Sequence, residues 1–127
     1  MASIFTKIIQ GEIPCHKIAE SEDYFAFLDI NPWEEGHTLV IPKKEVDYIF
    51  DLENETYLGL MAFSKEVAAA IEKTIKCKRV GVLVEGLEVP HAHVHLIPIV
   101  KGLHSRNKPK YSQEEFAKIA ERIRSNF

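Results

Sequence analysis

One ten-residue segment, VPHAHVHLIP at positions 89–98, constrains this chain more than any other. Histidine and apolar residues alternate strictly from His91 to Leu96, and a proline stands near each end. Alternation with a period of two is typical of a half-buried β-strand, because successive side chains point to opposite faces. We therefore expect Ala92, Val94 and Leu96 to enter a core, with the histidines in a row on the other face, about 7 Å apart.

Such a row of imidazoles can act as a nucleophile, as an acid or base, or as a set of metal ligands. Crowded imidazoles disfavour one another's protonation, so the middle ring should stay neutral with a free lone pair. His93 is therefore the candidate nucleophile, and His91 and His95 can orient an anionic phosphorus or acyl centre. Two alternatives are a zinc ion shared by two of the histidines and a solvated strand without chemistry.

The length of 127 residues suits one domain spanning 1–127, with a core at about 3–100 and a C-terminal loop and helix at 101–127. A formal net charge of −3 argues against broad binding to nucleic acid or to an anionic membrane. No apolar run resembles a secretion signal or a membrane span, and Cys15 and Cys77 suggest no disulfide framework. We expect a cytoplasmic protein.

Patterns along the chain predict an α+β fold. The expected elements are a short N-terminal helix at 3–9, strands at 15–20, 24–28, 39–41, 80–84 and 91–96, a long helix at about 52–75, and a C-terminal helix with a capping box at 112–115. The long helix should bury one stripe: Tyr57, Leu60, Met61, Ser64, Val67, Ala68, Ile71 and Ile75. Asp51 or Asn54 can cap its start. A five-stranded antiparallel sheet with this helix packed on it is the predicted architecture.

Several residues outside the histidine row have two interpretations. Ile4, Phe5, Ile8 and Phe27 are either plain core residues or the walls of an apolar slot for a purine base. Asp29 precedes a Pro-containing turn, so it is either a turn former or a carboxylate that grips a ribose diol.

Three more histidines and one basic segment remain, and the pattern gives no partner to His16 or His104. His37 begins the apolar run at 39–41, where a structural histidine would be ordinary. His16 and His104 are expected on the surface. The segment 101–110 is basic, and its composition predicts a solvated loop. Such a loop can attract phosphates if it lies near the site.

The sequence HAHVHLI at 91–97 matches the signature of the histidine triad (HIT) family, and the segment around His37 also resembles that family. The resemblance implies an α+β domain that forms a homodimer and binds a purine nucleotide without a cofactor. It also implies that His37 supports the triad by fixing the His93 tautomer, that Asp29 holds the ribose, and that the base lies in a slot. The slot residues would be Ile4, Phe5, Ile8, Phe27, Ile30 and Leu39.

The chain resembles the Hint-like branch of the family most. That branch implies attack by His93 on the α-phosphorus of a nucleoside monophosphate derivative, such as a purine nucleoside phosphoramidate, and then hydrolysis of a nucleotidyl-histidine. His95 and His91 would orient the phosphate oxygens. A dinucleoside polyphosphate hydrolase with the same nucleophile is the alternative within the family.

The sequence departs from the family pattern in two places. Where many members hold structural zinc with two cysteines and a histidine, this chain has Ser3, Thr6 and Glu45, so we expect no metal. Polar residues that hold the phosphate in the Hint-like branch are replaced by Val84, Leu87 and Glu88. Loss of one such donor costs about a hundredfold in rate or more, so a weakened nucleotide-binding module is a further alternative, besides a zinc protein.

Overall fold

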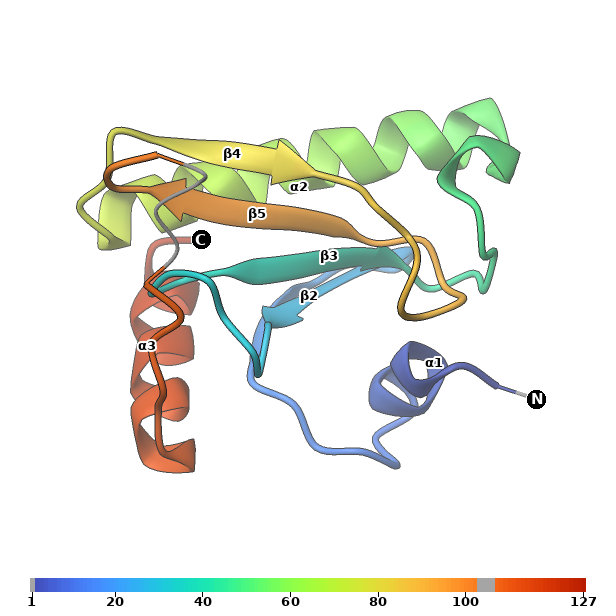
Figure 1. Cartoon of the computed structure of the whole chain (residues 1–127). Helices are drawn as coiled ribbons and strands as arrows, with labels where there is room; N and C mark the ends of the chain where they lie inside the picture. The colour runs from blue at the N-terminus through green and yellow to red at the C-terminus, as the bar shows by residue number, and fades with distance from the viewer. Residues whose placement is uncertain (1, 103–106) are drawn as a thin grey trace.

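The structure, a computed structural model, describes residues 2–102 and 107–127, and its centre is a five-stranded antiparallel sheet (Figure 1). The strands lie in the order β1-β2-β3-β5-β4. Their bounds are Lys17–Glu20 for β1, Tyr24–Leu28 for β2, Thr38–Pro42 for β3, Arg79–Leu83 for β4 and Val94–Ile99 for β5. The α+β class and the five antiparallel strands are as predicted.

Helices α2 (Asn54–Thr74) and α3 (Gln113–Ser125) share the main hydrophobic core with one face of the sheet. Ala92, Val94 and Leu96 are at most 1% exposed in this core, as the alternation predicts. The sheet face contributes Ile18, Ala26, Leu28, Val40, Val94 and Leu96. The C-terminal helix therefore packs into the same core as the sheet, and the division at residue 100 stays a prediction.

The long helix α2 buries most of the expected stripe. Leu60, Ser64, Val67 and Ile71 are buried, and so are Phe63 and Ala70, which the stripe omitted. The remaining stripe members on the helix, Tyr57, Met61 and Ala68, are partly buried. Glu53 stands at the N-cap without a side-chain cap bond, so the prediction of a cap by Asp51 or Asn54 was wrong.

The short helix α1 (Ile4–Ile9) lies on the opposite face of the sheet from α2 (Figure 1). Its Phe5 packs on Phe25 and Phe27 of β2 and on Leu39 and Ile41 of β3. Ser3 caps the helix, since its hydroxyl accepts a hydrogen bond from the backbone N–H of Thr6 at 3.1 Å. This second face carries the candidate site.

The segment that precedes β5 differs from the prediction. The strand begins at Val94, so only His95 of the three histidines lies within it. Pairing with β3 starts at Val94 and Val40, and the N–H of Ala92 instead donates to the carbonyl of Val46 at 2.7 Å. The extended segment keeps the alternation of faces without being hydrogen-bonded as a strand.

The C-terminal helix begins with the predicted capping box, formed by Ser112 and Glu115. His16, expected on the surface, packs on this helix: its ring stacks on Phe116 at 5.2 Å, and its Nε2 lies 2.8 Å from Oε1 of Gln113. His104 and part of the basic segment 101–110 lie outside the described residues. Of the helices in the described ranges, none combines the length and apolarity needed to cross a bilayer.

Candidate active site

His93 presents one ring nitrogen to an open cavity. Its side chain is 4% exposed, and its Nδ1 lies 2.7 Å from the backbone carbonyl oxygen of His91. A carbonyl can only accept, so Nδ1 carries the proton and donates it. Nε2 then holds a lone pair, and it makes no hydrogen bond to any residue that the structure describes. The His91 carbonyl therefore fixes the orientation of the ring, with Nε2 directed away from this bond.

His37 and His95 form a second hydrogen-bonded unit beside it. The backbone N–H of Trp33 donates to Nδ1 of His37 at 3.0 Å, so the proton of a neutral His37 ring stays on Nε2. Nε2 of His37 lies 2.9 Å from Nδ1 of His95, which must accept. The proton of His95 is therefore on its Nε2. His95 offers a donor next to the lone pair of His93, with ring centroids 5.0 Å apart.

Burial keeps both rings of this unit neutral. It lowers the pKa of His37 from 6.5 to about 4, against the opposing effect of Asp29. Burial also lowers the pKa of His95, with the neighbouring His93 acting in the same direction. The tautomers above therefore persist at neutral pH. The expectation that His37 fixes the tautomer of His93 is corrected here, because His37 contacts His95 and the His91 carbonyl holds His93.

A glycine fixes the position of His37. Gly36 has a φ of +88°, which L side chains rarely adopt, and a Cβ added to it would lie 2.9 Å from Cγ1 of Ile75. The turn can thus pass close to Ile75 at the end of α2 and deliver His37 directly to the start of β3. The close approach explains why glycine precedes this histidine.

His91 is buried behind the site. It is fully inaccessible, its Nε2 donates to the carbonyl of Pro42 at 2.8 Å, and its Nδ1 lies 2.8 Å from the hydroxyl of Ser3. Both ring nitrogens are therefore used inside the protein, and burial lowers the pKa of the ring. The expectation that His91 orients phosphate oxygens does not agree with this geometry. Its backbone carbonyl is what reaches His93.

Ser3, Thr6 and Glu45, the residues in place of the family's zinc ligands, lie together around His91. Oε1 of Glu45 accepts from the backbone N–H of Ser3 and from the hydroxyl of Thr6, both at 2.6 Å. The bond from Ser3 is the largest cause that lowers the pKa of Glu45 to about 2. Two hydroxyls already committed to hydrogen bonds do not fit a structural zinc site. The cluster ties α1 to the histidine segment by hydrogen bonds instead.

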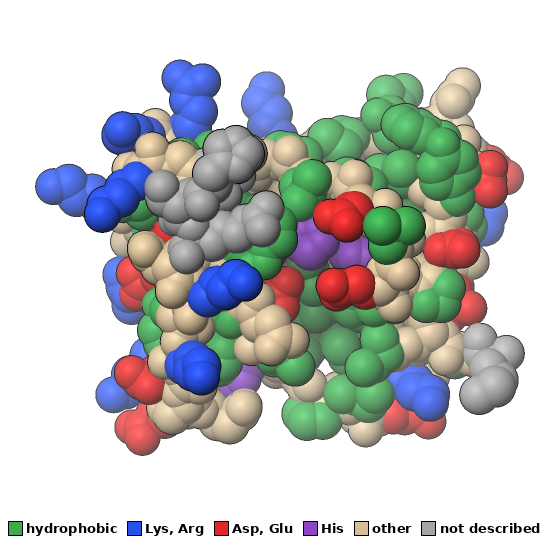
Figure 2. All heavy atoms as spheres, in the orientation of Figure 1, with side chains coloured by type: hydrophobic (Ala, Val, Ile, Leu, Met, Phe, Trp, Pro, Cys, Tyr) green, Lys and Arg blue, Asp and Glu red, His purple; other side chains and the backbone are tan. Residues whose placement is uncertain are grey.

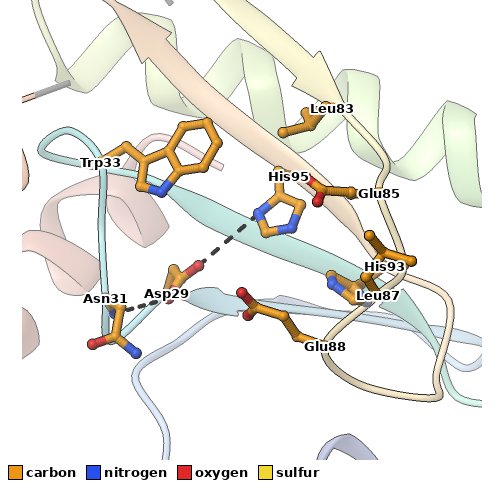
Figure 3. A pocket seen from close by; sticks show the side chains of 10 residues that line it. Asp29, Asn31, Trp33, Leu83, Glu85, Leu87, Glu88, His93 and His95 are labelled. Atoms are coloured by element: carbon orange, nitrogen blue, oxygen red, sulfur yellow. Dashed lines mark hydrogen bonds and ion pairs between the residues drawn. The ribbon is translucent and has the colours of Figure 1, made fainter. Parts of the chain in front are cut away.

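A cavity of about 280 Å³ opens in front of His93 and His95 (Figure 3). Its walls come from the turn after β2, from β4 and the loop that follows it, and from the two histidines. The lining residues are Asp29, Asn31, Trp33, Leu83, Glu85, Gly86, Leu87, Glu88, His93 and His95. Figure 2 shows histidine side chains recessed between acidic side chains on this face of the molecule.

Asp29 is a turn former, and its carboxylate also lines the cavity, while its binding of ribose stays a prediction. Its Oδ1 accepts from the backbone N–H of Asn31 at 2.8 Å, which is the contact of a turn former. Its Oδ2 lies 3.5 Å from Nε2 of His37 and 4.0 Å from Nδ1 of His95. The side chain is 17% exposed and faces the cavity, so a carboxylate stands beside the histidines.

Asp29, His37 and His95 have one ligand atom each within 4.8 Å of one another, which raises the question of a metal ion. A histidine that binds a metal normally donates its other ring N–H to an acceptor. Nδ1 of His37 instead accepts from the N–H of Trp33, so Nε2 is protonated and cannot ligate. The donor set fits a hydrogen-bonded relay and not a metal site.

The predicted base slot is only partly assembled. Phe5, Phe27 and Leu39 are buried in one cluster with Ile8 at its edge. The other two members, Ile4 and Ile30, are 48% and 65% exposed. None of the six lines the cavity in front of His93. The slot prediction therefore places core residues beside the site but does not describe the wall of this cavity.

Trp33 is the residue of the site that sequence reasoning missed. Its backbone orients His37, its ring stacks on His95 with centroids 6.4 Å apart, and it lines the cavity. The available signal was its place in the turn between Asp29 and His37, as the only tryptophan of the chain. Glu85 also lines the cavity and was not singled out.

The antiparallel sheet and the paired histidines define the histidine triad class of proteins. A family model of the HIT domain matches residues 10–102, and the chain belongs to the HIT family. Similar structures have the same fold: a Hit-like protein from Bartonella henselae, described as involved in cell-cycle regulation and crystallised with an unknown ligand, has a TM-score of 0.88. It is 32% identical, with 98% of this chain and 96% of that chain covered.

Two curated relatives show the range of similarity. The adenosine 5'-monophosphoramidase HNT1 of Saccharomyces cerevisiae is 40% identical over 98 residues, which cover 76% of this chain and 62% of the yeast protein. A HIT-like protein of Borreliella burgdorferi is 32% identical over 134 residues, covering 97% of this chain and 96% of that protein. The family shown by these matches is the one that the histidine pattern predicted.

Proposed function

We propose that this protein is a hydrolase or nucleotidyl transferase that cleaves the bond between the α-phosphorus of a purine nucleoside monophosphate and an amine. The observation that carries the proposal is the pair of opposite tautomers, a free lone pair on Nε2 of His93 beside an N–H on Nε2 of His95. The similarity to two yeast adenosine 5'-monophosphoramidases, 40% and 39% identical, supports the same activity.

The proposed reaction has two steps. Nε2 of His93 bonds to phosphorus, and the phosphorus–nitrogen bond breaks with its electron pair on the amine, which takes up a proton and leaves. Water then bonds to phosphorus and releases a proton, and the bond to His93 breaks, returning the lone pair to Nε2. The products are the free amine and the nucleoside monophosphate, and the chain uses neither a cofactor nor a metal.

Each neighbour of His93 has a separate task in this scheme. His95 donates its Nε2–H to a phosphate oxygen as charge develops. His37 holds the tautomer of His95, and the buried His91 supports His93 through its carbonyl. Asp29 accepts hydrogen bonds from the ribose hydroxyls at the edge of the cavity. The base is expected outside this cavity, beside the cluster of Phe5, Phe27 and Leu39, with Ile4, Ile8 and Ile30 around it, because Phe5 contacts the ring of His93.

The experiment that tests this proposal is intact-mass analysis of protein mixed with an adenosine phosphoramidate and quenched with acid. We expect a mass increase of one adenosine monophosphate, absent in His93→Ala. Asn is a matched control for the geometry, since His93→Asn retains a side-chain donor to the His91 carbonyl but has no nucleophile. If the wild type binds the nucleotide but forms neither adduct nor product, the result would favour the alternative of a nucleotide-binding module without catalysis. Leu87 and Glu88 are the residues that suggest this alternative.

We also propose that two copies form a dimer through the side of the molecule that carries β4 and α2. β4 is an edge strand, and apolar side chains are exposed on it, on the loop that follows it, on α2 and on the segment before α2. These are Tyr48, Phe50, Leu58, Val82 and Leu87, at 54–82% exposure. Light scattering after size exclusion tests the dimer, with a shift to monomer expected for Val82→Glu. The cytoplasmic location stays a prediction.

A further inference from the structure

The cavity in front of His93 is acidic, although a phosphate must enter it. Glu85 and Glu88 come from the loop between β4 and β5, and with Asp29 they give three carboxylates in its lining. The lining contains neither lysine nor arginine among the described residues. Figure 3 shows the carboxylate of Glu85 directed toward His95 and that of Glu88 directed toward Asp29.

The two glutamates are available to a ligand. Both are exposed, and neither makes an ion pair or hydrogen bond to a described residue. Acidic side chains lie on either side of the visible histidines on this face of the molecule (Figure 2). Between them, the 4% exposed His93 turns its unbonded Nε2 into the cavity, so the negative charges surround the point where the phosphorus must be attacked.

We infer that this site selects substrates whose leaving group is a cationic amine, with Glu85 and Glu88 as the residues that recognise its positive charge. The inference rests on the proposed function. A nucleoside phosphoramidate whose amine bears an ammonium group has no net charge, so it can approach three carboxylates. A dinucleoside polyphosphate has several negative charges, and its leaving nucleotide would lie against Glu85 and Glu88 with no basic residue to offset them.

The acidic lining of the cavity also suggests a function for the residues that depart from the family pattern. By the resemblance to the Hint-like branch, Glu88 and Leu87 stand at places where polar residues would hold the phosphate, and both line the cavity, with Leu87 82% exposed. Neutral donors there would favour the phosphate of any substrate. A carboxylate disfavours an anion and favours a cation at the same place, which is how charge produces discrimination between substrates. A carboxylate at this position therefore restricts the substrates to those whose leaving group is not negatively charged.

The test compares three adenosine 5'-phosphoramidates of matched length, made from 1,3-diaminopropane, 3-aminopropanol and β-alanine. We expect kcat/KM to fall from the ammonium to the hydroxyl to the carboxylate compound, by on the order of tenfold between the first and the last. Glu85→Gln/Glu88→Gln should bring the three values together. Glu12→Gln/Glu121→Gln, with the same change in net charge at distant exposed positions, should keep the wild-type order.

The salt dependence of the preference can be measured on the wild type alone, so this test does not require that a variant folds. Raising the ionic strength should compress the preference, because exposed charges are screened by salt. Equal kcat/KM values for the three compounds, with a normal nucleotidyl adduct, would overturn this inference and leave the proposed function standing. Absence of adduct and product with all three would overturn both. A preference that survives the double Gln variant would assign the selectivity to other residues and refute the role of these glutamates.

Discussion

Because His37 is buried in its neutral form, the free energy of unfolding should fall at mildly acidic pH by an amount that can be calculated. The ring is 1% exposed, and burial holds its pKa at about 4, compared with 6.5 for a free histidine. Between these two values the unfolded chain binds a proton that the folded protein does not. Folding stability from His37 is therefore fully present above pH 6.5 and is lost as the pH falls from 6.5 toward 4.

The size of the loss follows from the two pKa values. Each pH unit inside that window costs about 1.4 kcal/mol for one proton. Between pH 7 and pH 5 the free energy of unfolding should fall by about 2 kcal/mol because of His37 alone. His91 and His95 also have lowered pKa values and act in the same direction. The measurement is urea unfolding at pH 7, 6 and 5.

His37→Gln isolates the contribution of this ring. The Gln side chain is uncharged, and its amide can still donate toward Nδ1 of His95, while His91 and His95 titrate in both proteins. The loss between pH 7 and pH 5 should be about 2 kcal/mol smaller in the variant. Working at pH 5 and above stays clear of carboxylates such as Glu45, whose stability contribution is lost between its ordinary pKa of 4.5 and its folded pKa of about 2. Equal losses in the two proteins would refute the neutral burial of His37, and with it the tautomer assigned to His95.

Three substitutions elsewhere test the packing that supports the site. Gly59→Ala should destabilise the protein by about 1–3 kcal/mol even though alanine favours helix, because the added Cβ would overlap the hydroxyl oxygen of Tyr24; Tyr24→Phe should partly restore the urea midpoint. Ser3→Ala should cost about 1–2 kcal/mol in urea unfolding, since it removes the cap of α1 and a hydrogen bond to the ring of His91. Leu60→Ala, at a fully buried position, should lower the unfolding free energy by about 2–5 kcal/mol, and a smaller loss would show that α2 can collapse onto the sheet.

The sheet could be predicted because its apolar pattern is local. Alternation along 91–96 determined which side chains enter the core, and Ala92, Val94 and Leu96 do so even where the backbone is not a strand. Where the strand begins could not be predicted. That depends on the end of β3 and on the carbonyl of Val46, which accepts the N–H of Ala92 from a segment far away in sequence.

The roles of the histidines could be predicted only in part, for the same reason. His91 and His95 flank His93 on either side in the alternation, so the pattern gives these two flanking histidines equivalent roles. The structure separates them because Ser3 and Pro42, from two other segments, take both nitrogens of His91. Trp33 is a similar case, since its contribution to His37 comes through a backbone N–H that no side-chain pattern reveals.

The backbone, not the side chains around the cavity, determines which nitrogen of each histidine carries a proton. A carbonyl fixes His93 with its lone pair outward, and an N–H, acting through His37, fixes His95 with its proton outward. Leu87 and Glu88, in the loop before β5, take no part in these contacts. The tautomer of His93 therefore does not depend on the loop residues that would contact the substrate. If the proposed function holds, a chain of this kind can change its leaving-group preference, or lose rate, without any change in the contacts that orient His93.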